Sequence, residues 1–188
     1  MGRTPRWEKA EKTSVMEKPR FILETTRLRL REFTLDDVDD MYLIQCDPEV
    51  TRYTGEDKSL TREEIERRIR EDVLGDYRKY GYGRWAVIYK PDGQLIGFAG
   101  LKYLEEMGEV DLGYRFARVY WGMGLATEAA QAVLDYGSQH LGMSRVIAMA
   151  MPANKASIRV LEKVGMQFEK PITADGVQAV LYKTNIQC

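Results

Sequence analysis

The sequence predicts an α/β (α+β) fold with a mixed, mostly antiparallel sheet of about six to seven strands and about four helices. Three observations indicate this class. Residues 28–33 alternate apolar and charged side chains, as a half-buried strand does. Ile65, Ile69 and Val73 recur every four residues, which forms an apolar stripe along a helix. Residues 145–151 are largely apolar, which is typical of an interior strand.

The first strand is followed by two predicted helices. A polar side chain within residues 34–36 is expected to cap the first helix, which ends at Pro48. Ser59 or Thr61 is expected to cap the second, strongly charged helix, and Gly81 ends it.

The rest of the chain alternates strands and helices. Turn residues 91–93 predict a hairpin, and glycines mark the ends of the later helices. The expected strands are 84–89, 94–104, 109–116, 145–151, 166–170 and 177–184, and the expected helices are 125–142 and 156–164. We expect residues 21–188 to form one domain, preceded by a loose leader, residues 1–20, that has few apolar side chains.

The charge balance argues against nucleic acid and membrane partners. The chain has 28 basic and 29 acidic residues, a net charge of -1, so it lacks a general attraction for phosphate backbones or anionic lipid. No apolar run approaches the roughly 20 residues of a membrane span. The spacing of Cys46 and Cys188 suits neither a metal site nor a disulfide framework. We therefore expect a cytoplasmic protein without a bound metal, either monomeric or homodimeric.

The most informative stretch is residues 120–129, where two glycines lead from a strand into a long helix. Gly122 and Gly124 carry no side chains, so successive backbone N–H groups can point at one anion. The N-terminus of the following helix adds a partial positive charge. The pattern predicts a seat for a pyrophosphate, to which Thr127 can add a hydroxyl donor.

Three alternatives compete for this loop. A P-loop needs Lys and then Ser or Thr after the last glycine, whereas Leu125 and Ala126 stand there. A dinucleotide site needs a small third residue where Thr127 stands and an acid about 20 residues later, and residues 144–151 hold no acid. Two glycines alone fit a plain strand-to-helix turn equally well.

A family resemblance resolves this ambiguity. Residues 121–129, WGMGLATEA, resemble the WGxGxATEA signature of the GNAT acetyltransferases, specifically the ribosomal-protein-alanine acetyltransferase type, RimJ and RimL. Further segments resemble family motifs in the expected order: 26–31, 47–53, 95–101, 111–114, 154–157 and 161–166. The similarity covers roughly residues 26–184.

The resemblance implies an N-acetyltransferase. A primary amine, from a protein N-terminus or a small molecule, attacks acetyl-CoA directly in a ternary complex. The sheet is expected to splay between strands 109–116 and 145–151, the fourth and fifth of the family, with the pantetheine arm between them. The coenzyme-binding residues that the resemblance implies are Phe116, Gly122, Met123, Gly124, Leu125, Ala126, Thr127, Asn154, Lys155 and Ser157.

The resemblance also suggests catalytic residues. Asp111 is the expected base, and Glu109 is the second candidate because strand alternation places it on the same face. Either can act through water, and either can instead be a solvated strand residue. Ser157 is expected to stabilise the leaving thiolate. Asn154 can equally be a helix cap, and Lys155 can equally be a solvated surface charge.

The sequence alone does not identify the amine that accepts the acetyl group. In this family it is shaped by the first helices, residues 53–55 and the last hairpin. Acids within residues 36–40 and 56–57 could attract a cationic acceptor, although acids at a helix start also serve its dipole. The alternative function is a CoA-binding regulatory or scaffold domain without transfer activity, because a fold does not settle activity.

Overall fold

The computed structural model describes residues 19–55, 60–174 and 176–184. Within them, eight strands form one sheet in the order β1-β2-β3-β4-β5-β6-β8-β7. Every neighbouring pair is antiparallel except β5 and β6. The strands are β1 Phe21–Glu24, β2 Leu28–Arg31, β3 Arg84–Tyr89, β4 Gln94–Leu104, β5 Glu109–Phe116, β6 Ile147–Ala150, β7 Gln167–Ala174 and β8 Val177–Lys183.

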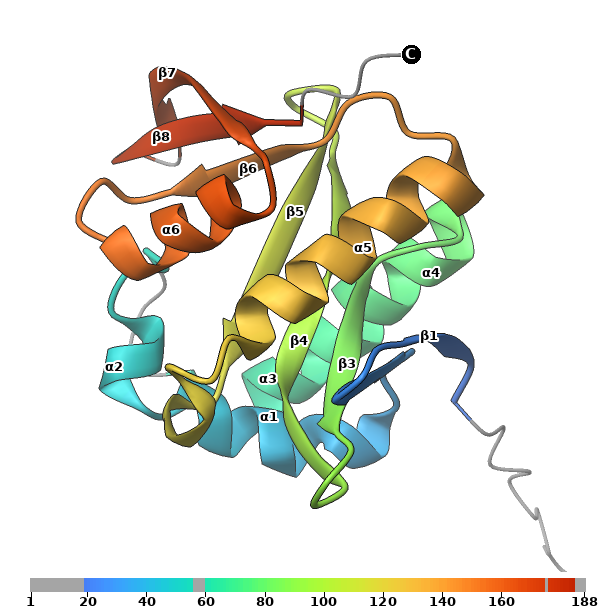
Figure 1. Ribbon diagram of the computed structural model, residues 1–188. Helices are drawn as coiled ribbons and strands as arrows, with labels where there is room; N and C mark the ends of the chain where they lie inside the picture. The colour runs from blue at the N-terminus through green and yellow to red at the C-terminus, as the bar shows by residue number, and fades with distance from the viewer. Residues whose placement is uncertain (1–18, 56–59, 175, 185–188) are drawn as a thin grey trace, which may run out of the picture.

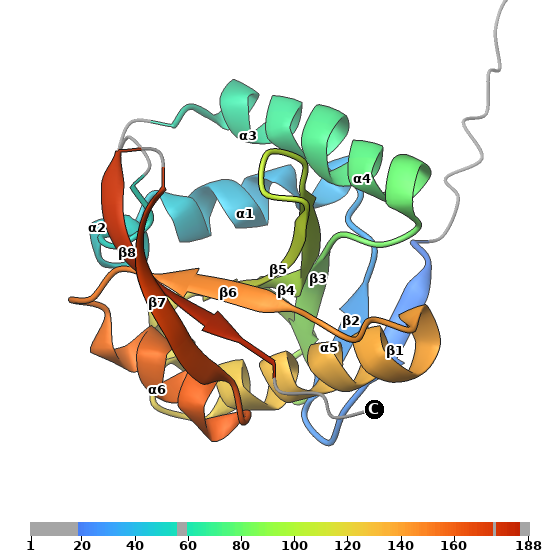
Figure 2. The same ribbon diagram turned by 90° about the horizontal axis from the view of Figure 1, so that it is seen from above.

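Helices cover both faces of the sheet. Figure 2 shows α1, α3 and α4 on one face and α5 and α6 on the other. The α-helices are α1 Val38–Gln45, α2 Pro48–Thr51, α3 Arg62–Arg68, α4 Leu74–Tyr80, α5 Leu125–Leu141 and α6 Lys155–Lys163. A π-helical turn, η2 Ile69–Val73, joins α3 to α4, and 3-10 turns form at η1 Leu35–Asp37 and η3 Arg118–Tyr120.

Each face of the sheet has its own apolar core, because successive strand side chains point to opposite faces. Trp85 and Val87 of β3 pack in the cluster that includes α5, whereas Ala86 between them packs in the cluster that includes α1 and α3. Burial of these two faces holds both helical layers to one sheet.

The structure confirms the predicted fold class and several boundaries. Strands 84–89, 94–104 and 109–116 have the bounds that the sequence predicted. Thr61 caps α3 in a capping box, accepting from the N–H of Glu64 at 3.2 Å while the Glu64 carboxylate accepts from the N–H of Thr61 at 2.6 Å. The alternative cap, Ser59, lies outside the described residues.

The sheet has one strand more than expected. The extra strand is β1, which pairs with β2 at the edge; its four residues have no alternating pattern that would have predicted it, and only Ile22 and Leu23 are half-buried. β7 continues beyond the predicted residue 170, because Pro171 is tolerated on an edge strand that pairs with β8 alone. In the described part of the chain, no helix combines the length and apolarity needed to cross a membrane.

Candidate active site

A cleft opens where the sheet splays. β5 and β6 run parallel and, in the described residues, share one Cα pair, Asp111 with Ile147. Figure 1 shows β6 leaving β5 at an angle beyond this point, which confirms the expected splay. A cleft of about 1020 Å³ lies along it, lined by Gly113 and Tyr114 of β5 and by Ala148 and Met149 of β6. Its volume lies at the upper end of ligand pockets.

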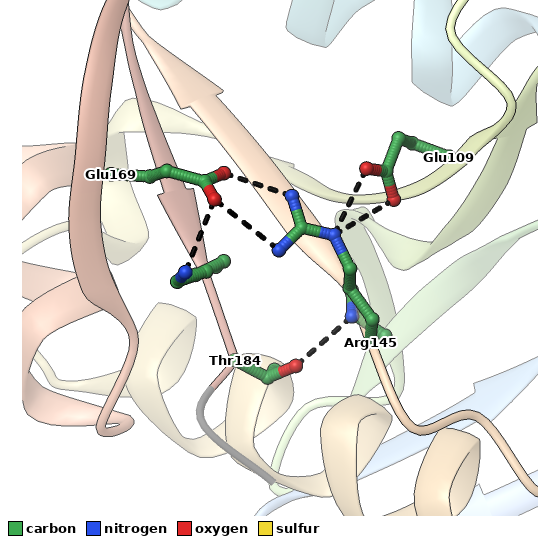
Figure 3. Close-up of polar contacts among 6 residues, drawn as sticks. Glu109, Arg145, Glu169 and Thr184 are labelled. Atoms are coloured by element: carbon green, nitrogen blue, oxygen red, sulfur yellow. Dashed lines mark hydrogen bonds and ion pairs between the residues drawn. The ribbon is translucent and has the colours of Figure 1, made fainter.

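A charged network holds the closed end of this splay (Figure 3). Arg145, just before β6, donates to Glu109 of β5 at 2.9 Å and to Glu169 of β7 at 2.8 Å. Lys183 of β8 donates to the same Glu169 at 3.1 Å, and the Val146 N–H donates to the Thr184 hydroxyl at 3.0 Å. Four strands are thereby tied together where the cleft ends.

The network predicts an acid-sensitive component of stability. Hydrogen bonds from Arg145 and Lys183 lower the pKa of Glu169 from 4.5 to about 2. Because the folded pKa is depressed, this stabilisation is complete above about pH 4.5 and is lost as the pH falls toward 2. Glu169→Gln should therefore lower the melting temperature at neutral pH, and the difference from wild type should vanish near pH 2. A difference independent of pH would contradict this assignment.

The predicted pyrophosphate loop has the expected geometry. Gly122 and Gly124 adopt φ values of +76° and +78°, in the left-handed region that favours glycine. The first intrahelical bond of α5 runs from the N–H of Glu128 to the carbonyl of Gly124 at 3.1 Å. The N–H groups of residues 125–127 precede it and have no intrahelical partner. They form the donor end of a helix that is 17 residues long.

Most of the predicted loop residues line the cleft. Those that do are Gly122, Gly124, Leu125, Ala126 and Thr127. Met123 does not: its side chain is exposed and its carbonyl accepts from Arg27 at 2.9 Å. Phe116 also lines the cleft, but its carbonyl is already used, since it accepts from the Trp121 indole at 2.8 Å.

Asp111 is buried at the apex of the cleft and forms an ion pair with Arg84 of β3. The guanidinium of Arg84 also donates to the carbonyl of Gly100 at 2.6 Å and to that of Asp111 at 3.0 Å. Burial raises the pKa of the Asp111 carboxyl, and the charges of Arg84 and Lys102 only partly oppose this effect. The result is a desolvated carboxyl group that is a stronger base than an exposed aspartate.

Sequence reasoning missed Arg84. Its guanidinium lies directly over Gly113, where an added Cβ would come within 2.4 Å of the Arg84 Cζ atom. The available signal was the glycine itself, since glycine inside a strand often marks a close approach by another group. The sequence did not show which group approaches.

Two further predicted site residues do not line the cleft. Glu109 shares a strand face with Asp111, but it lies where β6 closes against β5, and its carboxylate pairs with Arg145. Lys155, the first residue of α6, is exposed and lines a smaller groove beside the cleft. The roles of Glu109 as a base and of Lys155 as a coenzyme-binding residue stay predictions, and the lining of the cleft does not support them.

A pair of hydroxyl groups, those of Tyr114 and Ser157, also lines the cleft. Tyr114 donates to the carbonyl of Ser157 at 3.0 Å, and the two hydroxyl oxygens are also 3.0 Å apart. Burial raises the pKa of Tyr114 to about 12, so its hydroxyl remains protonated. Asn154 caps α6 by accepting from the N–H of Ser157 at 3.1 Å, and it also lines the cleft. Capping and ligand contact are therefore compatible.

The far arm of the cleft lies between the α2 region and the last hairpin. Tyr53, Thr54 and Gly55 line it together with Val177 of β8, and Val177 lies 3.6 Å from the position of a Cβ on Gly55. These are the segments expected to shape the acceptor site. None of the acids within residues 36–40 lines the cleft. Asp37, for example, is buried and pairs with Arg31. The predicted acids at 56–57 lie outside the described residues.

Comparisons with known proteins agree with this geometry. Residues 27–167 match the family model described as an acetyltransferase (GNAT) domain. The chain is 39% identical over 157 residues to "Uncharacterized protein YkkB" of Bacillus subtilis (strain 168), covering 80% of this chain and 87% of that protein. It is 34% identical over 153 residues to "Uncharacterized N-acetyltransferase p20" of Bacillus licheniformis, covering 78% of this chain and 83% of that protein.

A solved structure shares the fold. It is the ribosomal L7/L12 alpha-N-protein acetyltransferase RimL in complex with coenzyme A, which superposes with a TM-score of 0.73. The superposition covers 87% of this chain and 97% of the RimL chain at 15% identity. At this identity the likeness concerns the fold alone.

Proposed function

Since the chain belongs to the GNAT acetyltransferase family, we propose that it is an acetyl-CoA-dependent N-acetyltransferase acting on a primary amine. One observation carries the proposal. A single cleft connects the glycine loop at the start of α5, the buried carboxyl of Asp111 and the hydroxyl of Ser157. These are the three groups needed to bind a pyrophosphate, accept a proton and stabilise a leaving thiolate.

The glycine loop and the splay between β5 and β6 bind different parts of the coenzyme. The N–H groups of residues 125–127 and the dipole of α5 suit the pyrophosphate. Beyond Asp111, β5 forms no further pair with β6 in the described residues, and this edge lines the cleft where the amides of the pantetheine arm can bind. Binding along this edge would direct the thioester toward the apex of the cleft.

The reaction is direct attack in a ternary complex. The acceptor nitrogen forms a bond to the acetyl carbon, the nitrogen loses a proton, and the C–S bond breaks. Asp111 accepts that proton, directly or through one water, and its raised pKa makes it more effective in this role. Ser157, held by Tyr114, donates a hydrogen bond to the sulfur as negative charge develops on it, so coenzyme A leaves as the thiolate.

The acceptor is an amine that fits between the α2 region and the β7–β8 hairpin. A peptide N-terminus is one candidate and a small-molecule amine is the other. The use of acetyl-CoA and the free thiol of Cys46 fit a cytoplasmic location.

Thiol release from acetyl-CoA tests the proposal. Wild-type protein should release thiol with at least one class in a panel of peptides with different N-terminal residues, amino acids, polyamines and aminoglycosides. Coenzyme A binding is measured in parallel by calorimetry. Binding without thiol release across the whole panel would favour the alternative, a regulatory or scaffold domain that binds coenzyme A. Absence of binding would overturn both.

A further inference from the structure

Arg27 connects the start of β2 to the glycine loop, two segments about one hundred residues apart in the chain. Its Nε donates to Glu128 at 2.7 Å, and its Nη2 also lies 2.7 Å from the same carboxylate oxygen. Its Nη1 donates to the carbonyl of Met123 at 2.9 Å. The planar guanidinium therefore bridges the loop backbone and the first turn of α5, a fork geometry that lysine cannot reproduce.

Glu128 is held from a second direction. Its Oε1 accepts from the hydroxyl of Thr25 at 2.6 Å and from the N–H of Arg27 at 2.9 Å. Burial alone would raise the pKa of Glu128, but the hydrogen bonds from Thr25 and Arg27 outweigh it and leave the pKa lowered. The carboxylate is consequently ionised at neutral pH.

A carboxylate in this place poses an electrostatic problem. Glu128 lies in the first turn of α5, beside the N–H groups that suit an anion. Its negative charge alone would repel a pyrophosphate there. The positive charge of Arg27 compensates it, so the loop can be anchored by a carboxylate and still accept an anion.

We propose that Arg27 is a positioning residue for the coenzyme. It holds the carbonyl of Met123, between the two glycines, and neutralises Glu128, so that the loop is preorganised before the coenzyme binds. This inference rests on the proposed binding of coenzyme A at the loop. It links Arg27 with Glu128, which lie in two sequence segments that the family resemblance did not relate to each other.

We call the contacts of Arg27 with the Met123 carbonyl and with Glu128 the clamp. Four variants and a control test it. The variants are Arg27→Ala, Arg27→Lys, Glu128→Gln and the double variant Arg27→Ala/Glu128→Gln. The control is Arg29→Ala, because Arg29 lies two residues further along the chain, in β2, and pairs at the surface with Glu24, 3.6 Å away. Arg27→Ala should weaken coenzyme A binding, and raise KM for acetyl-CoA, by about 10-fold or more, since bonds between charged groups are lost. The kcat and the KM for the acceptor should change by less than about 3-fold.

The other variants separate charge from structure. The double variant should bind coenzyme A more tightly than Arg27→Ala, because it no longer leaves an unpaired carboxylate at the anion site. Arg27→Lys should weaken binding by about 3-fold, since it keeps the charge but not the fork, and it carries the test if Arg27→Ala does not fold. Arg29→Ala should bind as wild type does.

Two results would overturn the clamp. One is coenzyme A binding by Arg27→Ala, or by Arg27→Lys if only that variant folds, within 2-fold of wild type, even with a lower melting temperature. The other is a double variant that binds no better than Arg27→Ala. Failure of the wild type itself to bind coenzyme A would instead overturn the proposed function.

Discussion

Gly124→Glu is expected to abolish coenzyme A binding, raising Kd by more than about 100-fold. The residue has φ of +78°, which costs a non-glycine residue roughly 1–2 kcal/mol. The larger effect is electrostatic, because the substitution places a carboxylate at the N-terminus of α5, beside the N–H groups of residues 125–127 that are proposed to bind the pyrophosphate. Calorimetry with coenzyme A measures the loss.

Gly142→Glu is the matched control. Gly142 ends the same helix, has φ of +65°, and an added Cβ there meets nothing within 4 Å. It therefore imposes a similar backbone strain and the same charge, at the opposite end of α5 from the loop. We expect its Kd for coenzyme A to stay within about 2-fold of wild type. Equal loss of binding in both variants would show that strain, and not the anion site, is responsible.

Asp111→Asn should lower kcat by about 100-fold to 10,000-fold, the usual contribution of a general base. Burial raises the pKa of Asp111 above 3.8, and only the ionised form accepts a proton, so wild-type kcat/KM should rise with pH as this group ionises. That limb should disappear in Asp111→Asn. Two acceptors whose amines have different pKa values separate the titration of Asp111 from that of the substrate.

Glu109→Gln is the control for this experiment. Glu109 lies on the same strand face as Asp111 but outside the cleft, paired with Arg145. Its substitution should change kcat by less than about 3-fold, although it weakens the network at the closed end of the splay. Wild-type kcat in Asp111→Asn would show that the base is a water or another group. A drop confined to Glu109→Gln would reverse the assignment.

The residues at the splay show which features of the site could be predicted from the sequence. Alternation placed Asp111 and Glu109 on one face of a strand, and this part was correct. The two residues nevertheless have different surroundings, since Asp111 is buried against Arg84 and Glu109 pairs with Arg145. The difference depends on where β6 joins β5, which is a pairing between strands and leaves no periodic signal in either one.

The sequence by itself determined the elements whose cause is local. Strands 84–89 and 94–104 follow from the turn residues 91–93 between them. The cap at Thr61 is one of the two that the sequence offered. The loop at Gly122 and Gly124 follows from the freedom of glycine at positive φ. These signals lie within a few residues of the structure that they specify.

Only the tertiary structure decided which side chains meet. Arg84 is paired with Asp111 across 27 residues, Tyr114 with Ser157 across 43, and the backbone of Arg27 with Glu128 across 101. Each contact depends on the strand order and on the helix that covers each face of the sheet. Many side chains of the same types are present, and the burial energy of the whole domain selects the arrangement that brings these together.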